Sequence, residues 1–278
     1  MHSLANSDVA TLAGYNALLQ YLDVDNLIDY LMTHHYIGAY EWVPLNWVAA
    51  RLRAPGELWR FFPWDQEKSL RSYRKNSTIQ GKSAAPTGPY KPLRVYSAEF
   101  RLRFADHIQR HYFNGGALTE AAATARFLAR TNEINGPMVA ESARWGDARR
   151  KGRPYTRDGE WQAEVDKLLA TVFPVRSDVV LDQYKRLGLY PSTVAPTFNQ
   201  HGGTVSSGFM LTMTAPAGVI WYTLDGSDPR LQGGAVAPGA VQYTGPVTLS
   251  TPGSVTAQAR VLSGPDWSAL ESAGFTVQ

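Results

Sequence analysis

The sequence contains no cysteine, which excludes disulfide bonds and metal sites built on thiolate ligands. It has no apolar run of the ~18 residues that a membrane-spanning helix needs, and its first residues lack the charged and apolar regions of a signal peptide. Glycine-rich loops of the forms G-x-G-x-x-G and G-x-x-x-x-G-K-[ST] are also missing. These absences leave the compartment open, and we expect the chain to start inside a longer protein.

Charge is scarce and unevenly placed. Charged residues make up 18% of the chain, and the formal net charge is +3. Residues 1–194 hold 25 Lys and Arg against 20 Asp and Glu, whereas residues 195–278 hold 2 against 4. The densest basic stretch, residues 149–153, is typical of a solvated loop, so charge predicts no nucleic-acid partner.

The chain of 278 residues is long enough for two domains, and its composition changes sharply after Pro191. Before that point apolar residues recur mostly at helical spacing, with Asp23 as a predicted N-cap and Gly38 as a predicted helix end. We interpret residues 71–92 as a surface loop. Further helices are predicted over 98–112, 119–132, 137–149, 160–171 and 175–187.

Two aromatic-rich runs, 46–52 and 58–64, flank an Ala-Pro-Gly-Glu turn and predict a β-hairpin. After residue 196 short alternating runs separated by turn signals predict a β-sandwich. Phe209, Leu211 and Met213 are expected to face its core. The predicted fold is therefore α+β with two domains: residues 1–190, mostly helical with a β-hairpin, a linker over 191–196, and an immunoglobulin-like β-sandwich over 197–278.

The hairpin places three chemistry-bearing side chains within reach of each other. Glu41 precedes Asn46 by five positions, and Asp65 follows the second strand. Phosphoryl transfer needs a carboxylate that accepts a proton, together with an Asn and an Asp that hold Mg²⁺. A hairpin that enters at Asn46 and leaves at Asp65 would bring those two together. Spacing alone, however, favours a turn with capping residues.

The residues around these positions carry more information, because they match in combination. The stretches are Leu22–Tyr30, Asn46-Trp47, Phe61–Asp65, Phe100–Asp106 and Glu141–Asp147. Together they resemble the C-terminal half of CotH-type atypical kinases over roughly residues 10–190. That resemblance implies a kinase-like fold that binds ATP and Mg²⁺ and phosphorylates Ser or Thr of a protein substrate.

The resemblance also assigns residues, one position at a time. Asn46 and Asp65 match metal-binding positions, and Glu67 stands where a second metal-binding Asp commonly follows. Glu41 stands where the family usually has a catalytic Asp, and its longer side chain moves the carboxylate by about a bond length. Ångström-scale misplacement can cost ~10²-fold in rate. With no phosphate-covering loop in the chain, we expect it to be inactive by itself.

The second part of the chain has its own set of characteristic stretches: Ile220–Arg230, Tyr243–Pro246, Ala257–Arg260 and Trp267-Ser268. On these stretches residues 196–278 resemble the chitobiase/β-hexosaminidase C-terminal module. The resemblance implies an immunoglobulin-like, non-catalytic domain of secreted and often carbohydrate-related proteins. Asp225-Gly226 predicts a hairpin-type turn. Asp225 and Asp228 fall short of the 6–8 oxygen ligands that Ca²⁺ takes, which favours a turn there.

Other candidate metal-binding or catalytic residues have weaker support in the sequence. His107 and His111 stand four residues apart and could bind Zn²⁺ on one helix face, but the Glu of a zincin motif is absent between them, which favours a packed or half-exposed pair. Glu141 and Asp147 beside Trp145 suggest a glycosidase pair, although capping or an ion pair is the commoner reason for such spacing.

Two functions follow from these patterns. The first is a fragment of a CotH-like kinase with Glu41 as catalytic residue and Asn46, Asp65 and Glu67 as Mg²⁺ ligands. The alternative is a non-catalytic, exported surface or carbohydrate-associated adhesion protein that uses the kinase-like half as a scaffold. In both, a bacterial parent is expected at the cell surface or outside the cell. The sandwich is a candidate for glycan contact if Trp221 or Tyr222 is exposed beside Trp267, but burial of both aromatics is the commoner outcome for such side chains. The oligomeric state stays open.

Overall fold

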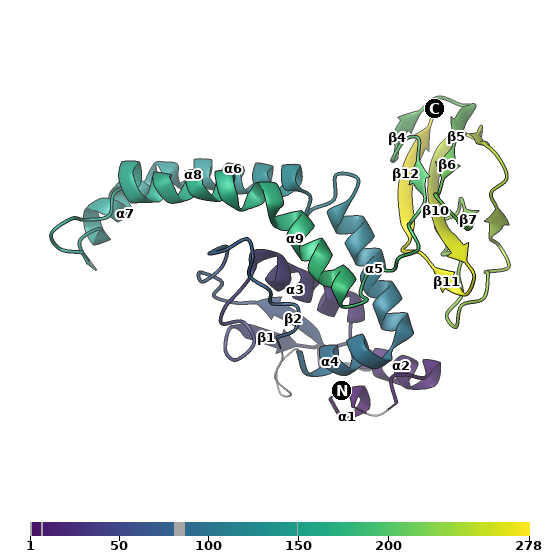
Figure 1. Ribbon diagram of the computed structural model, residues 1–278, viewed down its shortest axis with the longest axis horizontal. Coiled ribbons are helices and arrows are strands. Elements are labelled where there is room, and N and C mark those ends of the chain that lie inside the picture. Colours follow the sequence, from purple (N-terminus) through teal and green to yellow (C-terminus); the bar gives the residue numbers. More distant parts are fainter. Residues whose placement is uncertain (1, 7, 81–86, 149) are drawn as a thin grey trace.

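The computed structural model describes residues 2–6, 8–80, 87–148 and 150–278. The chain forms a mostly helical region followed by a separate β-rich region, so the predicted α+β two-domain fold is confirmed (Figure 1). A helical arm projects from the helical body on the side away from the β-rich region. None of the helices in the described ranges is both long and apolar enough to span a membrane.

Helix α3 (Val24–Ile37) is central to the helical body, and the short helices α1 (His2–Ala5) and α2 (Leu12–Leu19) precede it. The Asp23 side chain caps α3 by accepting a hydrogen bond from the Asn26 N–H at 3.0 Å. The helix ends at Gly38, whose φ of 60° lies in the left-handed region that glycine adopts without strain. Both predicted helix ends are therefore confirmed.

The predicted hairpin is also present. Strands β1 (Trp47–Ala50) and β2 (Arg60–Pro63) pair antiparallel, with Trp47 opposite Pro63. The Asn26 side chain fixes β2 to helix α3, since its Oδ1 accepts from the Phe61 N–H at 2.6 Å and its Nδ2 donates to the Phe61 carbonyl at 3.2 Å. Phe61 is 2% exposed, so this anchor holds the hairpin against the core.

The interpretation of 71–92 as a loop is wrong over its last part, and 81–86 lie outside the described residues. Helix α4 (Thr87–Tyr96) is followed directly by α5 (Ala98–Tyr112), which Ser97 caps by accepting from the Phe100 N–H. Tyr90 and Leu93 stand three residues apart and are buried, at 2% and 0% exposure. Because polar residues and prolines dominate this stretch, its short apolar face does not produce a helical pattern in the sequence.

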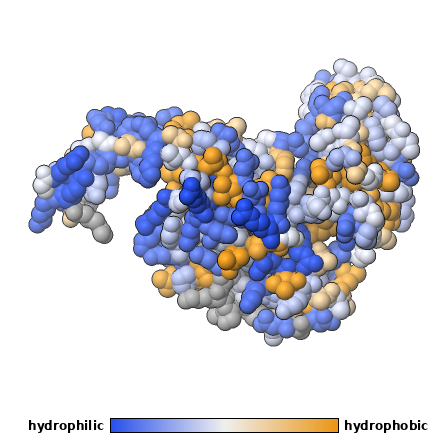
Figure 2. All heavy atoms as spheres, viewed as in Figure 1, coloured by the Kyte–Doolittle hydropathy of each residue, from blue (hydrophilic) through white to orange (hydrophobic). Residues whose placement is uncertain are grey.

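The arm comprises helices α6 (Glu120–Asn135), α7 (Pro137–Trp145) and α8 (Gln162–Thr171), with a π-helical turn η1 (Arg157–Trp161), and α9 (Phe173–Arg186) returns to the body. Helix α7 buries none of its residues. The tip of the arm is correspondingly mostly hydrophilic (Figure 2). Most side chains at the tip of the arm therefore face solvent and do not contribute to a core.

Residues 150–153 of the basic run lie at this tip, and the first residue of the run, Arg149, is outside the described residues. Arg150 is not simply solvated, because its guanidinium lies 4.1 Å from the centre of the Tyr155 ring and forms an ion pair with Glu160. Lys151 and Arg153 are exposed.

The β-rich region has two layers around one core. The larger sheet has the order β4–β12–β10–β7–β8, with β11 paired to β10, and the short pairs β3–β6 and β5–β9 complete the region. Leu211 and Val261 are fully buried between them. The strands are β3 (Thr197–Phe198), β4 (Gly203–Val205), β5 (Phe209–Leu211), β6 (Met213–Thr214), β7 (Val219–Thr223), β8 (Val241–Gln242), β9 (Val247–Leu249), β10 (Gly253–Ser263), β11 (Asp266–Trp267) and β12 (Glu271–Val277).

Two local expectations in this region need correction. The run from 209 to 214 divides into β5, which pairs with β9, and β6, which pairs with β3. Its alternation nevertheless holds, since Leu211 and Met213 are buried and Phe209 packs against the same core. Asp225-Gly226 is not a hairpin turn between neighbouring strands: β7 ends at Thr223, β8 starts only at Val241, and the Asp225 side chain accepts from the Ser227 N–H at 2.9 Å.

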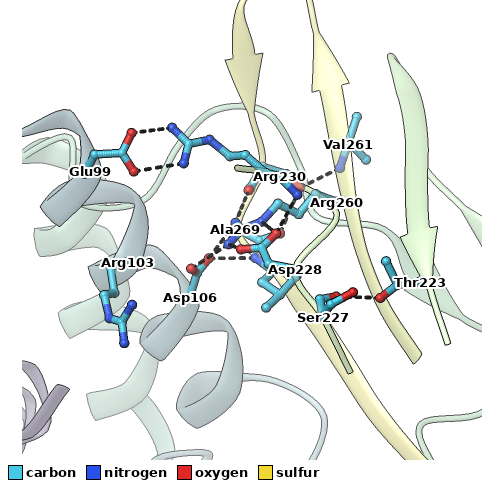
Figure 3. A network of polar contacts seen from close by, with 12 residues as sticks. Glu99, Arg103, Asp106, Thr223, Ser227, Asp228, Arg230, Arg260, Val261 and Ala269 are labelled. Atoms are coloured by element: carbon cyan, nitrogen blue, oxygen red, sulfur yellow. Dashed lines mark hydrogen bonds and ion pairs between the residues drawn. The ribbon is translucent and has the colours of Figure 1, made fainter. Parts of the chain in front are cut away.

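The two regions meet at helix α5 through an interdomain network of Glu99, Asp106, Asp228, Arg230 and Arg260 (Figure 3). Arg260 donates to both oxygens of Asp106, at 2.7 Å each, and Arg230 donates to both oxygens of Glu99, at 2.9 and 2.7 Å. Asp228 accepts from Arg260 at 2.8 and 2.7 Å, so the predicted turn residue is part of this network.

A second contact between the regions centres on Glu271, whose side chain is 2% exposed. Its carboxylate accepts from Gln109 at 2.5 Å and from Asn114 at 2.7 Å, and His201 Nε2 lies 2.7 Å from it. Strand β12 is thereby tied to helix α5 and to the loop after it. The β-rich region is thus tied to the body by polar and charged side chains, of which those of Arg260 and Glu271 are almost fully buried.

Candidate functional site

The ends of the hairpin bring Asn46 and Asp65 together. Asn46 immediately precedes β1, Asp65 follows β2 by two residues, and the pairing of Trp47 with Pro63 closes the gap between them. The Asn46 Nδ2 donates to the backbone carbonyl of Asp65 at 2.9 Å. The structure thus places the two predicted ligands side by side, while their role as metal ligands stays a prediction.

The backbone of Asp65 is strained. Its φ of 54° is one of three positive values found among non-glycine residues in the described ranges, the others being at Leu70 and Asn114. Such a conformation costs on the order of 1 kcal/mol, and it persists only where surrounding contacts impose it. Gln66 supplies such contacts, because its Nε2 donates to the carbonyls of Asn46 at 3.3 Å and Trp64 at 2.5 Å. Strain of this kind clusters at sites that bind ligands.

Glu41 is connected to Asn46 through the backbone. Its carbonyl accepts from the N–H groups of Leu45 at 3.4 Å and Asn46 at 3.3 Å, which closes a short turn. The neighbouring Trp42 is fully buried and anchors this turn in the core. Glu41 is itself half-buried, so its carboxylate lies at the rim of the body, on the same turn that presents Asn46.

Lys68 is the residue that sequence reasoning missed. Its Nζ lies 2.6 Å from Glu41 Oε1, and the Lys68 carbonyl accepts from the Tyr40 N–H at 3.2 Å. The pair is separated by 27 positions and depends on the hairpin for its contact. Only its place shortly after Asp65 could have drawn attention to Lys68. The arrangement brings a carboxylate and a cation together beside the two predicted metal ligands, on the segments that enter and leave the hairpin.

Glu67 is exposed, and it does not form a three-ligand cluster with Glu41 and Asp65 in the described part of the chain. The site therefore offers two oxygen-donor groups on neighbouring backbone: the exposed Asp65 carboxylate, and the Oδ1 of Asn46, whose Nδ2 is already engaged by the Asp65 backbone carbonyl. Mg²⁺ is commonly held by one or two carboxylates, with water and substrate phosphates completing its shell. The donor set fits that ion.

Apolar side chains surround the site and are exposed. Val48 and Phe62 face each other across the hairpin, at 43% and 44% exposure. Leu45 and Trp64, which flank Asn46 and Asp65, are 73% and 63% exposed. Exposed apolar groups gathered around polar ones are typical of a surface that contacts a ligand or another protein segment.

The other sequence candidates gain no geometry of this kind. Trp145 is 54% exposed on α7, and the Arg144 guanidinium lies over its ring at 4.9 Å, while the capping or ion-pair explanation for Glu141 and Asp147 stays a prediction. Trp267 is 6% exposed, and its Nε1 donates to the Gly234 carbonyl at 2.8 Å. Because Trp267 is buried, a sugar-stacking pair that includes it is not formed.

Comparison with known proteins agrees with both halves of the chain. A family model described as CotH kinase protein matches residues 5–172. A model described as chitobiase/beta-hexosaminidase C-terminal domain matches residues 200–270. No curated protein and no solved structure matches the chain.

Proposed function

Because the chain belongs to the CotH kinase protein family, we propose that residues 41–68 form the metal-binding and acceptor side of a phosphoryl-transfer site. Asn46 and Asp65 would hold Mg²⁺, and Glu41 would accept the proton of a Ser or Thr hydroxyl on a protein substrate. The contact between Asn46 and Asp65 carries this proposal, since it holds the two ligand residues side by side through the Asp65 backbone, whose φ is positive.

Each residue has a distinct task in this proposal. ATP with Mg²⁺ would supply the transferable phosphoryl group, and the metal would neutralise charge on the phosphates. Glu41 would orient the acceptor hydroxyl and take its proton. Lys68 would hold the Glu41 carboxylate in place and add positive charge where negative charge develops. Glu67 is exposed and would act on the metal only through water.

The sequence contains no glycine-rich phosphate loop, so we expect the 278 residues alone to show no appreciable ATP turnover. Tight, Mg²⁺-dependent ATP binding in calorimetry would overturn that expectation. The non-catalytic alternative, an exported adhesion protein, gains support from one observation, because Glu41 is already paired with Lys68. Loss of phosphoryl transfer in E41Q of a longer, active form would decide for catalysis.

Metal binding can be tested on the chain itself. Mn²⁺ is a paramagnetic substitute for Mg²⁺, and the indole N–H signals of Trp47 and Trp64 lie next to the two proposed ligands. We expect Mn²⁺ to broaden both signals in the unmodified chain and to leave them sharp in D65N. D182N is the matched control, since Asp182 is exposed on α9, and it should broaden as the unmodified chain does. Equal broadening in D65N would refute the metal site.

A further inference from the structure

Helices α3 and α5 face each other with a ladder of charged side chains. Asp25 and Asp29 stand one helical turn apart on α3, and Arg103, His107 and His111 stand at successive turns on α5. Residues four apart project from the same face of a helix. The two helices therefore present one row of carboxylates to one row of nitrogen-bearing side chains, one guanidinium and two imidazoles.

Three of these residues converge on a single point. His107 Nδ1 lies 2.6 Å from Asp29 Oδ1, and His111 Nε2 lies 3.1 Å from the same oxygen. One ligand atom from each of the three lies within 4.8 Å of the others. Two imidazole nitrogens and one carboxylate oxygen at such separations form a donor set that one metal ion can bridge.

The surroundings of His107 are those of a metal ligand that is oriented by further contacts. Its second nitrogen, Nε2, lies 3.0 Å from Asp25 Oδ1. Asp25 is in turn held by Arg103, whose Nε and Nη2 donate to its two oxygens at 2.5 and 2.6 Å. Metal-bound histidines almost always use their other ring nitrogen in this way, which fixes the tautomer and the ring plane.

Burial is graded across the cluster. The His107 side chain is 6% exposed, whereas those of His111 and Asp29 are 22% and 49% exposed. The inner ligand is thus fixed by packing, and the outer two are open to solvent. An ion could enter from that side, and a water molecule could complete its shell.

We propose that Asp29, His107 and His111 bind a divalent transition metal, with Zn²⁺ as the best fit, and leave one coordination position open to solvent. Two imidazoles with one carboxylate suit Zn²⁺, whereas Mg²⁺ prefers oxygen donors. The site would join α3, which anchors the hairpin, to α5, which carries the interdomain network. It is separate from the hairpin site and does not depend on the proposed phosphoryl transfer.

The same contacts have one competing explanation, in which protons take the place of the metal. His107 would then be a doubly protonated imidazolium between Asp25 and Asp29, and the ladder would be a set of ion pairs between helices. The two explanations differ in a measurable way. A metal site binds one equivalent of Zn²⁺ through both histidines, while an ion-pair ladder does not.

The test uses the tag-free chain, stripped of metal and titrated with ZnCl₂ in a calorimeter at pH 7.5. We expect one equivalent to bind with a Kd of about 1 μM or below, and Zn²⁺ to raise the melting temperature. H111Q should weaken binding at least ~100-fold, and D25N, which alters only the residue behind His107, ~10–100-fold. H201Q is the matched control, because His201 lies in the β-rich region, and it should bind as the unmodified chain does.

X-ray absorption of the Zn²⁺-loaded chain should show two imidazole ligands. H111Q retains the buried His107, so we expect it to fold, and circular dichroism checks that it does. Binding weaker than about 100 μM, or equal affinity in H111Q and the unmodified chain, would overturn the metal site and leave the ion-pair ladder. A negative result here does not affect the Mn²⁺ experiment on the hairpin.

Discussion

The hairpin site and the interdomain network both consist of charged and polar side chains, but they differ in how fully those groups are satisfied. Arg260 is 2% exposed and uses all five of its N–H donors, on Asp106, Asp228 and the Ser268 carbonyl. Asp65 is exposed, and its contact with Asn46 uses its backbone carbonyl and not its carboxylate. The network holds two domains together, whereas the hairpin keeps oxygen donors free for a ligand.

Electrostatics supports the same distinction. Burial alone would lower the pKa of Arg260, but the charges of Asp106 and Asp228 outweigh it and hold the pKa above its usual value. The guanidinium therefore stays charged over the whole pH range in which proteins fold. Arg260 can therefore stabilise the contact between the two domains, but it has no free N–H donor with which to bind a ligand.

The largest expected effect comes from removing Arg260. R260A leaves Asp106 and Asp228 without their common partner, and breaking a buried pair in this way costs about 3–5 kcal/mol. We expect a loss of that size in the free energy of unfolding, measured by denaturant titration. R130A removes the exposed pair with Glu133 and should change stability by less than about 0.5 kcal/mol. Similar losses in both variants would contradict the comparison.

A smaller, pH-dependent effect is expected at Glu99. Burial tends to raise its pKa, but hydrogen bonds from Arg230 and the Gly233 N–H outweigh this and hold the pKa below its usual value of 4.5. The unfolded chain then binds more protons at this carboxyl than the folded chain. The pair with Arg230 therefore stabilises the fold above pH 4.5, and this stabilisation is lost as the pH falls below that value.

E99Q tests this directly, since it keeps the shape of the side chain and removes the titration. At pH 7 we expect it to cost about 1–3 kcal/mol, as for hydrogen bonds to charged groups. Its stability should fall less steeply below pH 4.5 than that of the unmodified chain, as followed by thermal unfolding from pH 7 to 3. E133Q, which alters an exposed carboxyl, should leave the decrease of stability below pH 4.5 unchanged. A parallel decline of E99Q and the unmodified chain would rule out this role.

The smallest effect is expected at the hairpin. Lys68 and Glu41 are 41% and 38% exposed, so K68A should change the free energy of unfolding by less than about 1 kcal/mol. Any loss of Mn²⁺ binding or phosphoryl transfer in this variant would then reflect the site and not the fold. A loss of stability comparable with that of R260A would show that the hairpin residues are structural.

Local patterns predicted much of the fold because they depend on neighbouring residues. Asp23 before an apolar run and Gly38 after it determine where α3 begins and ends. The alternation of Leu211 and Met213 with polar residues identifies the face that enters the core. The segment 87–96 was missed because its apolar pair, Tyr90 and Leu93, is short and lies among prolines.

The candidate site divides in the same way. Asn46 and Asp65 could be predicted to meet, since a hairpin joins its own two ends. Lys68 could not be placed against Glu41, and Asp29 could not be placed against His111, because the partners lie 27 and 82 positions apart. No periodicity in a single segment encodes which helix faces which.

The sequence by itself determined the two-domain class, the helix ends and the hairpin, because each follows from local backbone preferences and from the period of apolar residues. Only the tertiary structure decided that Arg260 joins Asp106 across 154 positions and that helix α3 faces helix α5. Those contacts depend on how whole elements pack. Packing is set by the summed burial of many side chains and by the need to pair every buried charge.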